Sequence, residues 1–135
     1  YDLTRNSNSE LANISTRGLV SRGDGALISG FIIGSRSDAS VVVRAIGPSL
    51  AAAGISNVLG DPLLTVFDSN GAAIASNDNW RTDAQAATLE LVQLAPTDDA
   101  EAATLLTLPP GPYTAVVEGA DGGTGVGLVE VYNLP

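Results

Sequence analysis

Oxygen-bearing side chains are the residues of this chain whose types and spacing could do chemistry. Two polar stretches bring a group of them together: Asp68, Asn70, Asn77, Asp78, Asn79 and Asp83. Ca²⁺ takes about six to eight oxygen ligands in proteins, so Asp68, Asn70, Asn77 and Asp78 are candidate calcium ligands. The spacing does not match an EF-hand, and Asn and Asp are equally the ordinary residues of turns. Calcium is therefore the one cofactor that the sequence suggests, and turn formation is the simpler interpretation.

Groups that could perform catalysis are sparse. The chain contains no His and no Cys, so it lacks the commonest general base and the thiolate metal ligands. Its serines have neither His nor Lys to activate them. Asp98, Asp99 and Glu101 could act in acid–base catalysis if one of them were desolvated. Their position after Pro96 predicts instead the acidic first turn of a short helix. We expect a protein without enzymatic activity.

Three short motifs resemble functional signatures. The glycine-rich run at 122–127 resembles a phosphate-binding loop, but it has no Lys and precedes a strand, so a hairpin or a close backbone approach is expected. Arg22-Gly23-Asp24 spells the integrin-binding tripeptide, although Gly-Asp is ordinary turn chemistry. Asn13-Ile14-Ser15 is a glycosylation sequon, which makes Asn13 a candidate glycan site.

Net charge excludes several classes of partner. The formal charge is −9, and all six cationic residues are Arg. Nucleic acids and anionic membranes attract clustered cations, so neither is an expected partner. No apolar run approaches the roughly 20 residues that span a bilayer, and membrane insertion is not expected. Acidity suits an exported protein, and we expect an extracellular or cell-surface location.

Short β-branched runs dominate the chain. Ser40–Ile46 and Tyr113–Glu118 are the clearest predicted strands, and Val126–Tyr132 alternates like a half-buried strand. One helix is predicted at Ala84–Leu94, where a capping box precedes apolar residues at helical spacing and Pro96 ends the pattern. The expected fold class is mainly β, an antiparallel, jelly-roll-like β-sandwich with one short helix that caps an open end.

The N-terminal residues differ from the rest. Residues 1–16 are mostly polar and are expected to form an extension, either a linker or a donated strand, and residues 17–135 to form the β-sandwich module. Tyr1-Asp2-Leu3 is echoed by Tyr132-Asn133-Leu134 near the other end. The echo indicates a unit that repeats head to tail. The repeats are either tandem modules of one chain or separate subunits whose terminal segments occupy equivalent places.

Five stretches together resemble a known kind of module. They are 11–18, 27–34, 43–50, 74–80 and 123–132. They are similar to an uncharacterised module of large secreted bacterial surface proteins, often present in tandem copies. From Leu63 onward the chain also resembles pre-peptidase C-terminal domains, which are β-sandwiches with a strand that starts like Pro110–Thr114. Modules of this kind also occur as units of extracellular fibrils, so the resemblance implies assembly by strand complementation.

The resemblance implies a structural subunit of an extracellular bacterial filament or surface assembly. Copies would associate head to tail, with residues 1–16 pairing with an open edge of the next unit. The receiving edge is expected at Val126–Tyr132 or at its neighbour in the sheet. The expected interface residues are Leu3, Leu11, Ile14, Val129 and Val131.

The alternative is a non-catalytic, carbohydrate- or surface-binding module attached to a larger secreted protein. Such sites usually present exposed aromatic side chains that stack on sugar rings. Trp80, in the polar stretch Asn77–Arg81, is the one good candidate for such a ligand contact.

Overall fold

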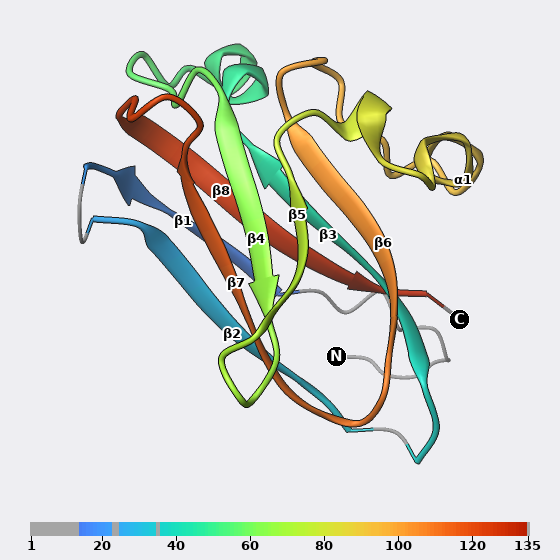
Figure 1. The fold of residues 1–135 in the computed structure, drawn as a ribbon. Helices are drawn as coiled ribbons and strands as arrows, with labels where there is room; N and C mark the ends of the chain where they lie inside the picture. Colours follow the sequence, from blue (N-terminus) through green and yellow to red (C-terminus); the bar gives the residue numbers. More distant parts are fainter. Residues whose placement is uncertain (1–13, 23–24, 35, 135) are drawn as a thin grey trace.

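Two four-stranded antiparallel sheets form the protein in a computed structural model that describes residues 14–22, 25–34 and 36–134 (Figure 1). The first sheet has the order β1-β8-β3-β6, and the second has the order β2-β7-β4-β5. The strands of the first sheet are β1 (Ile14–Val20), β8 (Gly125–Asn133), β3 (Ala39–Ile46) and β6 (Ala102–Leu108). Those of the second sheet are β2 (Leu27–Ile33), β7 (Gly111–Gly119), β4 (Pro62–Phe67) and β5 (Ala73–Asn77). The predicted β-sandwich is confirmed.

Most connections cross from one sheet to the other. Among the described strands, only β4 and β5 are both consecutive in sequence and paired. They are joined by a tight turn in which Asp68 N–H donates to the Ala72 carbonyl at 3.0 Å. The glycine-rich segment is therefore not a hairpin, because β7 and β8 lie in different sheets. Its expected role in a close backbone approach is confirmed at Gly125, where φ is +149° and an added Cβ would lie 2.6 Å from Leu59 N.

The main core lies between the sheets and follows the alternation of the strands. In β7 the side chains of Tyr113, Ala115 and Val117 point inward and are buried. In β8 the same holds for Val129 and Val131. Side chains alternate between the two faces of a strand, so one face of each sheet supplies this core.

A second, smaller core covers the outer face of the first sheet. It contains Val42, Trp80, Leu89 and Ala103, and it explains why β3 is buried on both faces. Trp80 belongs to a 3₁₀ turn, η3 (Trp80–Thr82), and Leu89 to the helix α1 (Ala86–Leu91). The helix thus packs on a sheet face and not over an open end of the sandwich. Figure 1 shows it beside β6.

The helix is also shorter than the sequence predicts. It begins at Ala86 and ends at Leu91, within the predicted 84–94. Beyond it, Gln93 adopts a φ of 62°, and the N–H groups of Leu94 and Ala95 both donate to the Leu89 carbonyl. The chain therefore turns back before Pro96 is reached. No helix in the described part of the chain is long and apolar enough to cross a membrane.

Candidate functional site

The four candidate calcium ligands lie at the two ends of β5. Asp68 and Asn70 belong to the β4–β5 turn, where Asp68 Oδ1 accepts hydrogen bonds from Asn70 N–H at 2.9 Å and Ala72 N–H at 3.0 Å. Asn77 ends the strand, and its Oδ1 accepts a bond from Ala103 N–H at 3.1 Å. The five residues of β5 separate the two ends by roughly 17 Å. The residues the structure describes contain no group of three acidic, His or Cys side chains placed to hold a metal.

Glu101 is the most buried charged side chain among the described residues, and its role is structural. It is fully buried. Its Oε2 accepts hydrogen bonds from Gly47 N–H at 3.0 Å and Ser49 N–H at 2.8 Å, and its Oε1 accepts one from Ser49 Oγ at 2.7 Å. These bonds tie the start of the 3₁₀ turn η2 (Pro48–Ala53) to the start of β6. The predicted short helix at 98–101 is a turn that leads into β6.

The other members of that acidic group are not arranged for catalysis. Asp99 is exposed and pairs with Arg81 at 2.6 Å. Asp98 Oδ1 accepts a bond from Ala100 N–H at 2.9 Å, as in a turn. Since Glu101 faces backbone N–H donors and Asp99 faces solvent, no pair of these carboxylates flanks a place for a substrate.

Arg44 joins the first sheet to the segment that follows α1. It pairs with Glu130 across β3 and β8, with 2.6 Å between Nη2 and Oε1, and its Nη1 donates to the Leu94 carbonyl at 3.1 Å. The guanidinium also lies 5.2 Å from the centre of the Tyr132 ring. Arg44 thus lies on the outer face of the first sheet and is held there by the carboxylate of Glu130. Arg17 is exposed on β1.

The indole of Trp80 is a core side chain. It is 3% exposed and packs in the second core, and the Arg81 guanidinium lies 4.5 Å from the centre of its ring. Its Nε1 has no hydrogen-bond partner among the residues that the structure describes. A ring so covered offers no platform on which a sugar could stack, which differs from the role expected for Trp80.

The Asp61 carboxyl lies near two other carboxylates, those of Asp78 and Asp121. Burial, followed by the nearby charges of Asp78 and Asp121, raises the pKa of the Asp61 carboxyl above its usual value. Its Oδ1 is buried and has no hydrogen-bond partner in the described part of the chain. The protonated form of Asp61 is thereby favoured relative to an exposed aspartate.

The structure describes some of the residues expected at the assembly interface and not others. Leu3, Leu11 and Asn13 lie outside the described residues, as do Gly23 and Asp24 of the tripeptide. Ile14 opens β1 opposite Val131 of β8 and is partly exposed. Val129 and Val131 are buried in the main core.

Because β8 pairs with β1 on one side and β3 on the other, Val126–Tyr132 is not an open edge. The residues 14–16, assigned from sequence to the extension, pair with β8 of the same chain.

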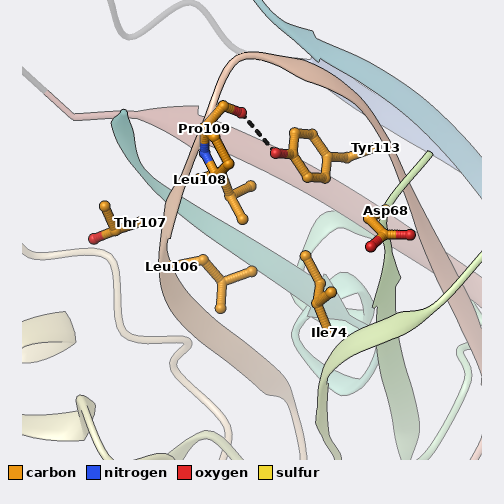
Figure 2. A pocket seen from close by; sticks show the side chains of 7 residues that line it. All are labelled: Asp68, Ile74, Leu106, Thr107, Leu108, Pro109 and Tyr113. Carbon is orange, nitrogen blue, oxygen red and sulfur yellow. Dashed lines mark hydrogen bonds between the residues drawn. The ribbon is translucent and has the colours of Figure 1, made fainter. Parts of the chain in front are cut away.

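The sheets do leave an open side where the edge strands β5 and β6 face each other. There an apolar groove of about 290 Å³ opens between the sheets, and Figure 2 shows its side chains. Its lining residues are Asp68, Ile74, Leu106, Thr107, Leu108, Pro109 and Tyr113. Tyr113 Oη donates to the Pro109 carbonyl at 2.6 Å and is thereby fixed in the wall of the groove.

The groove is not visible in the sequence, because β6 lacks a recognisable strand pattern. The run Ala102–Leu108 (AATLLTL) has no clear alternation and is as compatible with a helix as with a strand. Its strand conformation follows from pairing with β3, from Ala45↔Ala102 to Ala39↔Leu108. No local sequence pattern indicates that β6 pairs with β3.

Comparison with known proteins gives a likeness of fold only. No protein-family model matches the chain, and no curated protein matches its sequence. The pre-peptidase C-terminal domain of a collagenase from Bacillus anthracis is similar in structure, with a TM-score of 0.54, 14% identity and 88% of each chain covered. A chain of the Bacillus endospore appendages, described as disulfide-linked pili, aligns over all of both chains at 11% identity, but its TM-score of 0.33 carries no inference. The first comparison confirms the predicted likeness to pre-peptidase C-terminal domains at the level of fold.

Proposed function

We propose that this chain is a structural subunit of an extracellular bacterial filament or surface assembly, in which copies associate head to tail by strand complementation. The observation that carries the proposal is the way in which β1 is held. Of its seven residues only Val20 is buried, whereas Ile14, Ser15, Arg17 and Leu19 are exposed. β1 is an edge strand with β8 as its strand partner.

Such a strand is bound by its backbone more than by its side chains. Strand addition of this kind uses main-chain hydrogen bonds for affinity and leaves specificity to a few side chains. The backbone pairing of the exposed strand β1 with β8 supports a role for main-chain hydrogen bonds in such an assembly. Residues 14–16 are paired within their own chain, so residues 1–13 are the segment that would pair with a neighbour.

Head-to-tail contact between a terminal segment and a different surface of the next copy is heterologous. A contact of this kind does not close into a dimer but continues from copy to copy, which suits a filament. The proposal fits the arrangement of three of the carboxylates in the part of the chain that the structure describes: Glu101 holds backbone N–H groups, and Asp99 and Glu130 pair with arginines.

The test is to replace residues 1–13 by a Gly/Ser segment of the same length and to compare it with the unchanged chain. Electron microscopy and light scattering report assembly, and thermal unfolding reports the sandwich. The unchanged chain should form filaments, and the replaced chain should stay monomeric with an unchanged Tm, because β1 is retained. Filaments that persist after replacement, or an intact chain that stays monomeric at every concentration tested, would contradict the proposal.

The second candidate, a non-catalytic binding module of a larger secreted protein, rests on the fold. The collagenase domain with the same architecture is a C-terminal domain of an enzyme. Saturable binding of the monomeric chain to a polysaccharide, retained when residues 1–13 are replaced, would favour this candidate. The low exposure of Trp80 argues against a stacking site.

A further inference from the structure

We propose that the groove between β5 and β6 receives residues 1–5 of a second copy of this chain, with the Leu3 side chain inside it. This inference rests on the proposed function and names its receiving surface. It replaces the edge expected from sequence, because β8 is paired on both sides.

The groove has the size and polarity of a side-chain receptor. Ile74 approaches from β5, Leu106 and Leu108 from β6, and Tyr113 forms the inner wall (Figure 2). A cavity of about 150 Å³ lined by such side chains is enough to bind benzene. At about 290 Å³ this groove has room for an aliphatic side chain and part of a second one. Ile74, at 39% exposed, stands at its mouth.

The free edge of β6 lies along the same groove. β6 ends the first sheet and pairs with β3. Near its start the outer edge is occupied, since Ala103 N–H donates to Asn77 and Trp80 N–H donates to the Glu101 carbonyl. From Leu106 to Leu108 the outer edge of β6 borders the groove and pairs with no described strand. A strand added there would extend the sheet and direct alternate side chains between the two sheets.

The first five residues of the chain have the pattern that this groove fits. In an extended segment Tyr1, Leu3 and Arg5 share one face, and Asp2 and Thr4 share the other. Successive residues of one face are about 6.6 Å apart, so Arg5 would lie next to the groove when Leu3 is inside it. Asp68 lines the groove, and both of its turn bonds go to Oδ1. Its negative charge is complementary to Arg5.

The positions of the donated segment and the groove suit association between copies. The segment enters the sandwich at Ile14 on β1, and β1 and β6 are the opposite edges of the first sheet. The 11 residue-to-residue steps from Leu3 to Ile14 reach at most about 40 Å, enough to bridge to an adjacent copy. A donor that leaves at one edge and a receptor at the other make a contact that repeats without closing.

Disulfide trapping tests the assignment, because the chain has no Cys of its own. A Leu3→Cys chain is mixed with an Ile74→Cys chain under mild oxidation, and the mixed dimer is identified by mass spectrometry. The control partner is Leu19→Cys, which is 63% exposed on β1 and outside the groove. We expect the mixed dimer with Ile74→Cys at several times the yield found with Leu19→Cys.

Two results would overturn the groove assignment alone. One is assembly that needs residues 1–13 while the Ile74→Cys yield does not exceed that of the control. The other is a Leu3→Cys/Ile74→Cys double variant that forms its disulfide only within one chain at assembling concentrations. An intact chain that never assembles would instead contradict the proposed function. Failure of the groove assignment and failure of the proposed function therefore give different results.

A charge variant gives an independent readout. Asp68→Asn keeps an oxygen that can accept the two turn bonds and removes the charge that faces Arg5. An exposed ion pair contributes up to about 1 kcal/mol, so the critical concentration for assembly should rise by up to about fivefold. The Arg5→Gln variant should show the same rise, and combining the two should add little. Additive effects would contradict the pairing.

Discussion

Ser49 and Glu101 form a two-point contact: the Ser49 backbone N–H donates to Oε2 at 2.8 Å and its hydroxyl donates to Oε1 at 2.7 Å. The carboxylate thereby supplies acceptors to the N-terminal end of η2, where the first N–H groups of a helical turn have no partner within the turn itself. A buried charge is tolerated here because hydrogen-bond donors surround it.

Replacing Glu101 should therefore destabilise the protein strongly. In Glu101→Ala the N–H groups of Gly47 and Ser49 stay buried without a partner, and we expect a loss of about 3 kcal/mol in the free energy of unfolding. Urea unfolding followed by tryptophan fluorescence measures it. Asp99→Ala removes the same charge from the exposed pair with Arg81 and should cost less than about 1 kcal/mol. Equal losses in the two variants would show that the bonds of Glu101 contribute little.

The packing of α1 on the first sheet predicts a contrast between two leucines of one helix. Leu89 is fully buried in the second core, whereas Leu91 is 82% exposed. Leu89→Ala should lower the free energy of unfolding by about 2–5 kcal/mol, because it leaves a cavity. Leu91→Ala should change it by less than about 0.5 kcal/mol. Similar values for both would mean that the helix does not pack on the sheet as described.

Gly125 should not tolerate a side chain. Its φ of +149° and the 2.6 Å between an added Cβ and Leu59 N together predict a loss of about 3 kcal/mol for Gly125→Ala. Thermal unfolding measures the effect. Gly34 is the control, since an added Cβ there meets nothing within 4 Å. If Gly125→Ala unfolded at the same temperature as Gly34→Ala, the close approach of Val58 and Leu59 to β8 would be disproved.

Asp61 predicts a pH dependence. Its pKa is raised in the folded state above the ordinary value of 3.8, so the folded protein binds the proton more tightly than the unfolded chain does. This contribution favours folding most below pH 3.8 and is lost as the pH rises through the raised pKa. At neutral pH Asp61→Asn should raise the Tm, and the gain should shrink toward pH 4.

The control for that effect is Asp38→Asn, which makes the same change of net charge at an exposed position. A Tm difference between Asp61→Asn and Asp38→Asn that stays constant from neutral pH to pH 4 would contradict the assignment.

The strands and turns that were predictable are those with a recognisable pattern in their own local sequence. Val126–Tyr132 belongs to a strand, as its alternation predicts, and the turn chemistry of Ser69–Gly71 lies where two paired strands reverse. The helix was predicted too long because apolar residues continue at helical spacing to Leu94. In the structure the contacts of Leu89 with the sheet and the reversal at Gln93 end it earlier.

The functional residues were less predictable, since their surroundings come from distant parts of the chain. A polar neighbourhood in sequence indicated that Trp80 would be exposed, yet it is covered by residues of β3 and β6 and the segment after α1. Within the acidic run 98–101, Glu101 is buried and accepts hydrogen bonds from backbone N–H groups, whereas Asp99 is exposed and pairs with Arg81. Their different roles depend on which atoms approach each carboxylate.

By itself the sequence determined the class of the fold and the absence of His and Cys chemistry, since periodicity and composition are local properties. The tertiary structure decided which strands are edges, that β8 is central, and that β5 and β6 leave an apolar groove between them. Strand order depends on pairing between residues far apart in the chain, such as Val41 with Leu106 and with Asn133. No window of the sequence contains both partners of such a pair, and so the groove could be found only in the folded protein.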